Sequence, residues 1–434
     1  MTKPPGGRRA QSRAAREARE AAPAARSQHR AAVRHETDHA SQKQRDPSAL
    51  VLPAELEARL AAGHPWIYRD HVPPRFTARA GELVHVECGR FEAWALWDRD
   101  SPIALRIFSR QGRPDAAWVK ARVAEAWALR QQLVPPQTDA FRLLFGEGDG
   151  LPGVVVDVYA GFAIIVSYSP ALSEVVAWVA QALSERTEIQ GVCERVTRRK
   201  DRVSELRRLS GQPPPEVVIV EEHGLRYEVD FEAGQKTGLF LDHRENRQYL
   251  RGLSRGKTVL NLFAYTGAFS VSCAAGGATH VTSVDIAAPA IEAAARNVLH
   301  NALPPAVHEG VAQDVFEFLE SAARAGRRWD IVIADPPSFA SSRAELFGAL
   351  RAYKKLHAAA LSVLTPGGLY AGASCTAQVS PDAFRQSLAE GAARVRQRLT
   401  VVHEVAHAAD HPYAAGHLEG RYLKFVLSRS LPLA

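Results

Sequence analysis

Two residues that could do chemistry, Asp335 and Cys375, each follow a short apolar segment with the composition of a buried strand. Asp335 begins Asp335-Pro-Pro-Ser-Phe directly after Ile331-Val-Ile-Ala, and Cys375 ends the next such segment 40 residues later. Two successive prolines keep the backbone extended and offer no amide hydrogens, so the loop is stiff and can present its carboxylate to a planar ring. A cysteine thiolate is a nucleophile that forms covalent intermediates. The pair predicts covalent catalysis on a planar base.

Cytosine is the base that suits this pair. Carbon 5 of cytosine is too weak a nucleophile to attack a sulfonium methyl group, but addition of a Cys375 thiolate to carbon 6 would make carbon 5 enamine-like. Asp335, protonated or hydrogen-bonded at ring nitrogen 3, would stabilise the negative charge that develops on the ring. The Asp-Pro-Pro-aromatic pattern is typical of methyltransferases that act on nitrogen or carbon atoms of bases. We therefore predict Cys375 and Asp335 as catalytic residues.

The four cysteines, Cys88, Cys193, Cys273 and Cys375, include no Cys-x-x-Cys pair. No nearby group of histidines could complete a zinc site with them, so we predict neither structural disulfides nor a bound metal. A scattered cysteine usually packs as a small hydrophobic residue, which is the alternative for Cys375. Its place one strand after Asp335 favours the catalytic role.

The elements that would position this pair lie in the C-terminal part of the chain. From about Gly256 onward, short β-rich segments alternate with helical segments of ten or more residues, such as 288–299 and 347–364. Such alternation indicates a Rossmann-like α/β fold, with a mostly parallel sheet and helices on both faces. Ligands bind beyond the carboxyl ends of such strands, where Asp335 and Cys375 are predicted to lie.

A cofactor turn is predicted after the first strand of this part. In Asn261-Leu-Phe-Ala-Tyr-Thr-Gly-Ala-Phe, Gly267 allows the backbone to approach a ligand closely. Asp285 ends the second strand 18 residues later, where an acidic residue can bind ribose hydroxyls. Both features also occur in α/β proteins without such a site. Gln313-Asp314 ends the third strand region, which faces adenine in this architecture, and Asp314 also fits a helix capping box with Glu317.

Two smaller blocks precede the α/β part. Residues 49–112 alternate apolar and polar positions, which predicts a small β domain, and a helix follows over about 115–132. Residues from 141 onward predict an α+β block with a helix over 172–183. Within it the charged stretch Arg195–Arg208 is expected to be a solvated loop or helix face rather than an RNA contact.

The chain has a formal net charge of +7, and most of the excess lies in residues 1–48, which hold eleven Lys/Arg against five Asp/Glu. This tail has few aromatic residues and is predicted to be disordered or partly helical. It is either a solvated extension or an arm that releases counterions from RNA phosphates. No apolar run reaches the roughly 18 residues of a membrane span, and no signal peptide pattern occurs, so we expect a cytoplasmic protein without membrane contact.

Taken together, these motifs resemble a known family, the bacterial large-subunit rRNA cytosine-carbon-5 methyltransferases of the ribosomal large subunit methyltransferase I type. The resemblance covers roughly residues 55–430. The segments that carry it are Gly63-His-Pro-Trp-Ile-Tyr, Asp149-Gly-Leu-Pro-Gly, Glu221-Glu-His-Gly, Gly234-Gln-Lys-Thr-Gly-Leu-Phe-Leu-Asp-His-Arg, Asn261-Leu-Phe-Ala-Tyr-Thr-Gly, Asp335-Pro-Pro-Ser-Phe, Ser374-Cys-Thr and Ala409-Asp-His-Pro.

The resemblance implies four regions: the basic tail over 1–48, a PUA-type RNA-binding domain over 49–122, a central α+β domain over 135–233 and a class I methyltransferase domain over 234–434. It implies a lip, Gly234–Arg244, over the cofactor and the entering base. The implied partner is ribosomal RNA or a large-subunit assembly intermediate, and a homodimer is compatible with the sequence. The residues assigned to S-adenosylmethionine are Phe263, Tyr265, Thr266, Gly267, Asp285, Gln313, Asp314 and Asp335. The residues assigned to RNA are His64, Trp66, Lys236 and Arg244.

Two positions depart from the family pattern. Ser338 stands where many other RNA cytosine-carbon-5 methyltransferases carry a second cysteine, and Thr376-Ala-Gln follows Cys375 where small or hydroxyl residues are common. The base that removes the carbon 5 proton is therefore unassigned. Two alternatives stay open: a base-amine or guanine-N7 methyltransferase of the same fold, which needs no cysteine, and a noncatalytic RNA-binding assembly factor.

Overall fold

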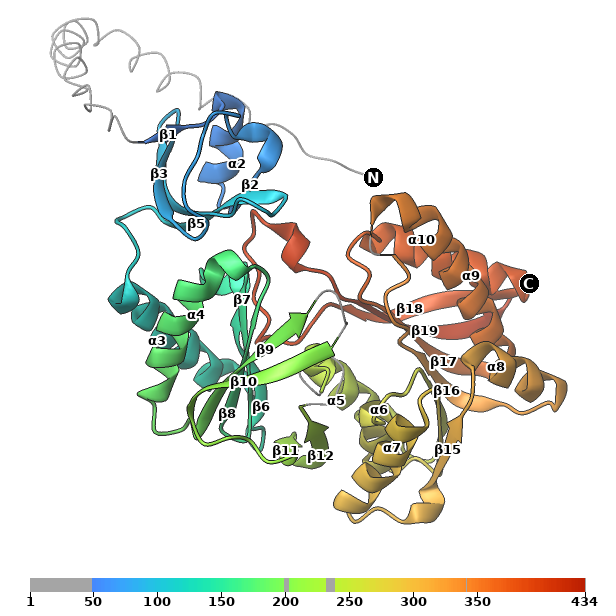
Figure 1. The fold of residues 1–434 in the computed structure, drawn as a ribbon. Coiled ribbons are helices and arrows are strands. Elements are labelled where there is room, and N and C mark those ends of the chain that lie inside the picture. Colours follow the sequence, from blue (N-terminus) through green and yellow to red (C-terminus); the bar gives the residue numbers. More distant parts are fainter. Residues whose placement is uncertain (1–48, 199–202, 232–238, 341, 434) are drawn as a thin grey trace, which may run out of the picture. The chain divides into compact units, whose positions relative to one another are not determined.

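The computed structural model describes residues 49–198, 203–231, 239–340 and 342–433 (Figure 1). In these ranges the strands form two five-stranded sheets, a two-stranded sheet and a seven-stranded sheet. Among the described helices, none combines the length and apolar character needed to cross a membrane. The predictions for the tail and for Lys236 lie outside the described residues.

The first sheet has the strand order β1-β3-β4-β5-β2 and closes around its own apolar core, which includes Leu105 and Phe91. The alternating pattern of the sequence predicted its three longest strands, and all three are confirmed. Helix α3 follows, and the Asp115 side chain caps its first turn by accepting from the Trp118 amide at 2.8 Å. The elements are β1 (Leu50–Val51), α2 (Glu57–Ala61), β2 (Trp66–Tyr68), β3 (Leu83–Cys88), β4 (Phe91–Trp97), β5 (Ile103–Ser109) and α3 (Ala116–Leu133).

The second sheet, with the order β10-β9-β8-β7-β6, carries α4 and α3 against its apolar face. The run Val154–Tyr159 is buried throughout because α3 and α4 cover one face and the hairpin β11–β12 packs near the other. The predicted helix over 172–183 is confirmed as α4. The elements are β6 (Ala140–Phe145), β7 (Val154–Tyr159), β8 (Phe162–Ser167), α4 (Ser173–Ser184), β9 (Gly191–Arg198), β10 (Val203–Gly211), β11 (Val217–Glu222) and β12 (Leu225–Asp230).

The charged stretch Arg195–Arg208 was expected to be a loop or helix face, and that prediction is wrong. Its described residues belong to the antiparallel strands β9 and β10, which pair from Arg198↔Val203 to Gly191↔Gly211. The reason is a period of two in β10: Leu206 and Leu209 alternate with the exposed Arg207 and Arg208 region. The high charge hid an ordinary two-faced strand.

The seven-stranded sheet has the order β15-β14-β13-β16-β17-β19-β18, in which β13 to β17 are parallel neighbours and β19 is antiparallel to β17 and β18. The order reverses between β13 and β16, and ligands bind at such a reversal beyond the carboxyl ends of the strands. The strands are β13 (Thr258–Leu262), β14 (His280–Asp285), β15 (His308–Ala312), β16 (Trp329–Ala334), β17 (Leu364–Ser374), β18 (Gln397–Val405) and β19 (Lys424–Pro432).

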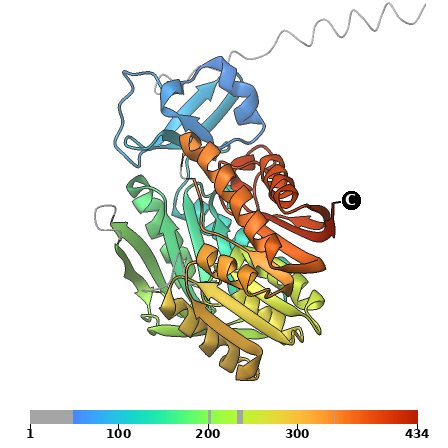
Figure 2. The same cartoon turned by 90° about the vertical axis from the view of Figure 1, so that its right-hand side faces the viewer.

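Helices cover both faces of this sheet (Figures 1 and 2). Alternate residues of each central strand point to opposite faces, so Val332 packs with α8, α9 and α10 while Ile331 packs with α5 and α6. The Rossmann-like α/β fold predicted from the sequence is confirmed. The helices are α5 (Arg244–Leu253), α6 (Ala268–Ala275), α7 (Ala288–His300), α8 (Val315–Arg324), α9 (Leu346–Ser362) and α10 (Pro381–Arg394).

Candidate functional site

A pocket lies at the reversal of strand order, where β13 and β16 end side by side. Five of the residues singled out in the sequence line it, and the other walls come from the segment around η6 (Leu241–His243), from α5 and from α6. The predicted residues in the wall are Phe263, Tyr265, Asp285, Asp335 and Cys375. The two predicted catalytic residues and three predicted cofactor residues therefore share one cavity.

The turn after β13 forms one wall in an uncommon backbone conformation. Phe263 and Tyr265 have φ values of 57° and 49°, and Gly267 has 75°. Left-handed residues other than glycine are uncommon and gather at functional sites. Gly267 is needed for a second reason, since a Cβ built on it would lie 2.6 Å from Ala294 Cβ on α7. The turn thus brings α6, α7 and the pocket wall close together.

Gly267→Ala is expected to lower the free energy of unfolding and the affinity for S-adenosylmethionine together. Gly256→Ala is the matched control, because Gly256 has a similar φ of 71° but nothing within 4 Å of its added Cβ. The clash with Ala294 should make Gly267→Ala the more costly change by about 1–3 kcal/mol. Urea unfolding and calorimetric titration measure the two effects, and equal losses in both variants would contradict the steric explanation.

Asp285 ties the second strand end to the turn. Its Oδ2 accepts from the Tyr265 amide at 2.9 Å and its Oδ1 accepts from the Ala287 amide at 3.0 Å. A carboxylate has about four acceptor positions, so further donors such as ribose hydroxyls can still bind to it. The Gln313 amide donates to the carbonyl of Asp285, and Asp314 caps α8 through the Phe316 and Glu317 amides. The predicted N-cap role of Asp314 is confirmed.

The remaining cofactor assignments lie beside the pocket rather than in its wall. Thr266 and Gly267 belong to the turn, and the Thr266 carbonyl accepts from Asn297 on α7. Gln313 and Asp314 follow β15 and are not among the lining residues. Contact of these four residues with a cofactor stays a prediction.

Asp335 follows β16 and pairs with a histidine that sequence reasoning did not assign. His243 Nε2 lies 3.2 Å from Asp335 Oδ2, and Asn246 Nδ2 lies 2.9 Å from His243 Nδ1. Because an amide nitrogen only donates, Nδ1 accepts and the ring proton lies on Nε2, where it is donated to Asp335. His243 is buried whereas Asp335 is partly exposed. The histidine thus orients the carboxylate and leaves Oδ1 for a ligand.

Cys375 differs from the other three cysteines in exposure. Cys88, Cys193 and Cys273 are buried, and Cys375 is the one with intermediate exposure. Burial raises the pKa of Cys273 to about 12 and also raises the pKa values of Cys88 and Cys193. A thiol with a raised pKa forms little thiolate, so these three are structural. Cys375 is the thiol placed for chemistry.

The two residues that depart from the family pattern contact each other. Ser338 Oγ lies 3.2 Å from Thr376 Oγ1, and the Phe339 amide donates to the same Thr376 oxygen at 3.3 Å. The Tyr353 hydroxyl of α9 lies 2.8 Å from both Ser374 Oγ and Thr376 Oγ1. These bonds join the Pro-Pro loop to the Cys375 segment. Ser338 and Thr376 therefore hold the two catalytic loops together.

Arg244 does not fit its predicted contact with RNA. It is 0% exposed, and its Nη1 donates to Asp410 Oδ2 at 2.8 Å. The prediction is wrong because the partner is 166 residues away in the chain and the pairing buries both charges. Burial by itself lowers the pKa of Arg244, and Asp410 outweighs that effect, so the guanidinium stays charged.

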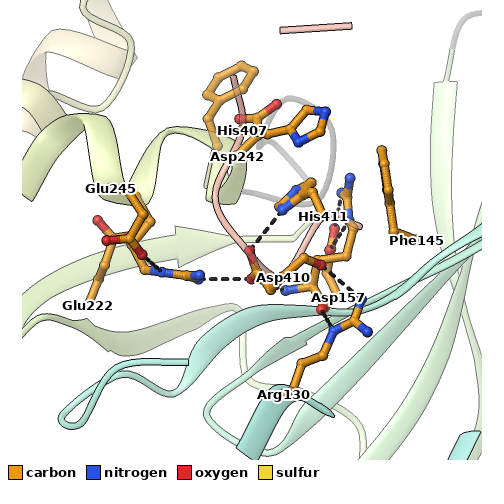
Figure 3. Close-up of polar contacts among 12 residues, drawn as sticks. Arg130, Phe145, Asp157, Glu222, Asp242, Glu245, His407, Asp410 and His411 are labelled. Carbon is orange, nitrogen blue, oxygen red and sulfur yellow. Dashed lines mark hydrogen bonds and ion pairs between the residues drawn. The ribbon is translucent and has the colours of Figure 1, made fainter. Parts of the chain in front are cut away.

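Asp410 is the centre of the network that holds this side of the pocket (Figure 3). Besides Arg244 it binds His411 Nδ1 at 2.9 Å, and its carbonyl accepts from Arg130 at 2.8 Å. Burial would raise the pKa of Asp410, but His411 and Arg244 hold it well below its usual value. The same C-terminal segment fastens Asp242 of the pocket wall, which accepts from the Ala408 amide. The network thereby fixes the segment that carries His243.

Asp410→Asn is expected to destabilise the fold by about 3 kcal/mol or more, because it leaves the buried charge of Arg244 without its carboxylate. Urea unfolding followed by circular dichroism measures the change. Glu320→Gln is the control, since Glu320 and Arg324 form an exposed pair on α8 that should contribute less than about 1 kcal/mol. The folded pKa of Asp410 is lowered, so its stabilisation is present above about pH 3.9 and is lost as pH falls below that value. Equal stability of Asp410→Asn and wild type would contradict this role.

His64 and Trp66 of the first sheet were also predicted to contact RNA. His64 is only 5% exposed, so the structure does not support an RNA contact for it. It packs against His417 with ring centroids 5.1 Å apart and lies 3.4 Å from Glu419. Trp66 is partly exposed and donates to Glu147 at 2.8 Å, and its contact with RNA stays a prediction.

His64, His417 and Glu419 are grouped closely enough to hold a metal ion. A guanidinium nitrogen of Arg59 nevertheless lies 2.5 Å from His64 Nε2, on the lone pair that a metal would need. The positive charge of Arg59 opposes a second cation at that place. We assign the group to packing between β2 and the segment before β19.

Comparisons with known proteins agree with this geometry. A family model described as S-adenosylmethionine-dependent methyltransferase matches residues 172–419, and a PUA-like domain model matches residues 50–110. A ribosomal RNA large subunit methyltransferase of Deinococcus radiodurans is 40% identical over 86% of this chain and 94% of its own. Ribosomal RNA large subunit methyltransferase I of Klebsiella pneumoniae is 34% identical over 86% of this chain and 96% of its own.

Two solved structures share the whole arrangement of described elements. The crystal structure of the methyltransferase SMU.776 complexed with SAH has a TM-score of 0.78 at 26% identity, and it covers 88% of this chain and 99% of its own. A SAM-dependent methyltransferase from Streptococcus mutans has a TM-score of 0.77 with the same identity and coverage. The fold predicted from the sequence, with its PUA-like and methyltransferase parts, is thus shared over nearly the full length of these proteins.

Three pocket residues were not assigned in the sequence: His243, Tyr353 and Lys424. His243 belongs to the segment Gly234–Arg244, which the family resemblance marked only as a lip. Tyr353 lies inside the predicted helix 347–364, where no local pattern separates a hydrogen-bonding tyrosine from a core residue. Lys424 opens the last strand and reaches the pocket from a neighbouring strand. Only the pairing of strands in space connects these residues to the site.

Proposed function

The chain belongs to the ribosomal RNA large subunit methyltransferase I family, and we propose that it transfers a methyl group to carbon 5 of a cytosine in large-subunit rRNA. Its cofactor is S-adenosylmethionine. The observation that carries the proposal is the presence of Cys375 and Asp335 in the wall of one pocket. A methyltransferase that acts on a base amine has no use for a thiol at this position.

The residues of the pocket suit this cofactor. The turn from Phe263 to Gly267 brings backbone to the cavity, Asp285 offers acceptor positions for hydroxyls, and Pro336 and Pro337 add an apolar wall. When bound, S-adenosylmethionine supplies an electrophilic methyl group on its sulfonium sulfur. Everything else that the reaction needs has to come from the chain and the RNA base.

The chain's part begins with the Cys375 thiolate, which adds to carbon 6 of the cytosine ring. The sulfur–carbon bond forms as the electron pair of the carbon 5–carbon 6 double bond moves to carbon 5, which then takes up the methyl group. The carbon 5 proton next passes to a base. The electron pair left behind restores the double bond and expels the thiolate, so Cys375 is regenerated.

Asp335 supports the ring while it carries extra electron density. Its Oδ2 is occupied by His243, and the second oxygen is free to face ring nitrogen 3, where a hydrogen bond would stabilise the developing charge. The His243 ring is itself held by Asn246. This chain of contacts fixes the orientation of the carboxylate before the base arrives, which lowers the reorganisation needed in the transition state.

The RNA is proposed to reach the pocket past the PUA-like domain at residues 50–110. Trp66 is the remaining described candidate for an RNA contact, and Lys236 is a further one outside the described residues. The described part of the chain is nearly neutral in charge, so a basic tail that contacts phosphates would make binding strongly dependent on salt. The substrate is ribosomal RNA or an assembly intermediate of the large subunit.

The test is to incubate the full chain with S-adenosylmethionine and large-subunit rRNA, digest the RNA and identify the methylated nucleoside by mass spectrometry. The proposal expects 5-methylcytidine. Methyl groups on guanine N2 or N7 or on adenine N6 would favour the base-amine or guanine-N7 alternative. Tight RNA binding without any methylated nucleoside or cofactor binding would favour the noncatalytic assembly factor.

A further inference from the structure

Lys424 lies next to the proposed nucleophile although it is distant in sequence. It is the first residue of β19 and pairs across the ladder with Ser374, the last residue of β17. Cys375 follows Ser374 directly, so the two strands bring lysine and cysteine to the same edge of the sheet. Lys424 is only 4% exposed. A buried lysine at this position needs an explanation, because burying a charge is costly unless it is paired.

The ammonium group of Lys424 is held by two backbone carbonyls. Nζ donates to the Thr376 carbonyl and to the Tyr422 carbonyl, each at 2.7 Å. Neither partner carries a charge, and none of the ion pairs found in the described residues includes Lys424. The Thr376 carbonyl is one residue past Cys375, so this bond also fixes the backbone that carries the thiol.

The charge that can pair with Lys424 is the thiolate of Cys375. Burial lowers the pKa of Lys424 to about 8, while the charge of Cys375 acts in the opposite direction. Electrostatic coupling is mutual, so an ammonium that is favoured by the thiolate favours the thiolate in return. The pairing gives the buried lysine a function, and it gives the nucleophile its charged form.

The other groups near Cys375 do not replace this cation. Asp335 approaches from the loop after β16, and its negative charge opposes a thiolate. His243 approaches from η6 but donates to Asp335. Tyr353 approaches from α9, and burial raises its pKa to about 12, which keeps it uncharged. Lys424 is the cation that these elements bring to the thiol.

We propose that Lys424 is the residue that activates Cys375, because its ammonium favours the thiolate and its bond to the Thr376 carbonyl holds the sulfur toward the incoming base. Lys424 acts through Cys375 and is thus a positioning residue. Ionisation of the thiol releases its proton to solvent, and the sulfur keeps the electron pair that later bonds carbon 6. The inference rests on the proposed role of Cys375 as the nucleophile.

The test measures the ionisation of Cys375 in the full chain, without RNA or cofactor. Iodoacetamide reacts with thiolates, and the other three cysteines are buried, so mass spectrometry of the Cys375 peptide reports alkylation at each pH. In wild type the alkylation midpoint is expected below the value of about 8.5 for an unperturbed cysteine. Lys424→Met should move the midpoint upward by at least one pH unit, which at neutral pH is about a tenfold slower reaction. Lys424→Arg should restore most of the wild-type profile.

Tyr353→Phe is the matched control for disturbance of the loop. It removes the hydroxyl that bonds Ser374 and Thr376 on both sides of Cys375 but changes no charge. Its midpoint should stay within a few tenths of a unit of wild type. An equal shift in Tyr353→Phe and Lys424→Met would overturn the proposal in favour of a purely structural role.

Two further outcomes decide the matter independently. If Lys424→Met does not fold, the wild-type profile still tests the inference, and a midpoint at or above that of an unperturbed cysteine overturns it. If the midpoint shifts as expected but rRNA gains no 5-methylcytidine, the proposed function fails while the activation of Cys375 by Lys424 stands. The two failures are therefore distinguishable.

Discussion

Cys375→Ala is expected to lower the rate of 5-methylcytidine formation by roughly 10⁴-fold or more, the scale of loss when an enzyme loses its nucleophile. The cofactor should still bind with nearly unchanged affinity, because the turn at Gly267 and the Asp285 carboxylate are untouched. Rates from labelled S-adenosylmethionine and dissociation constants from calorimetry measure the two quantities. Loss of rate without loss of binding would identify the thiol as part of the chemistry.

Ser338→Ala is the matched control for this variant. It removes one hydroxyl from the same pocket edge, where Ser338 bonds Thr376, but leaves the sulfur in place. Its rate should remain within about tenfold of wild type, since only one hydrogen bond of about 1 kcal/mol is lost. Full activity of Cys375→Ala would remove the basis for attack at carbon 6, and the base-amine alternative would then be preferred.

Asp335→Asn is the second large effect. The amide keeps the size of the side chain but loses the negative charge that accepts from His243, so the group beside ring nitrogen 3 is no longer oriented. The turnover number should fall by roughly 10²–10³-fold, the usual cost of losing one preorganised stabilising group. Steady-state kinetics with saturating RNA and cofactor give this number.

The division between kcat and cofactor affinity decides what Asp335 does. A fall confined to kcat supports its role at the ring of the base, and Asn246→Ala, which frees His243 Nδ1, should then give a smaller loss of the same kind. A weaker cofactor with unchanged kcat would contradict that role and assign Asp335 to S-adenosylmethionine alone.

The sequence predicted those parts of the site that local patterns mark. Asp335 and Cys375 each end an apolar strand, and parallel strands of one sheet end at the same edge, so their meeting in the pocket followed from chain order. Gly267 and Asp285 were likewise recognisable from the turn and strand end they occupy. The family resemblance joined these motifs into one fold, and the described elements agree with it.

The parts that could not be predicted depend on contacts between distant segments. Arg244 resembled a surface cation until its pairing with Asp410 showed it to be buried. Lys424 reaches Cys375 only because β19 inserts next to β17 in the antiparallel direction. The β9–β10 hairpin was missed because charge was weighed above its period of two. Each of these features is set by tertiary pairing, which a single sequence does not display.

The central claim is that Cys375 forms a covalent bond with the cytosine it methylates. Large-subunit RNA that carries 5-fluorocytidine tests it most directly, because fluorine at carbon 5 cannot leave as a proton and the adduct is trapped. With S-adenosylmethionine present, mass spectrometry of the digested complex should find the methylated nucleotide attached to the peptide that contains Cys375. Normal release of methylated RNA without any adduct, or attachment to a different residue, would contradict the account.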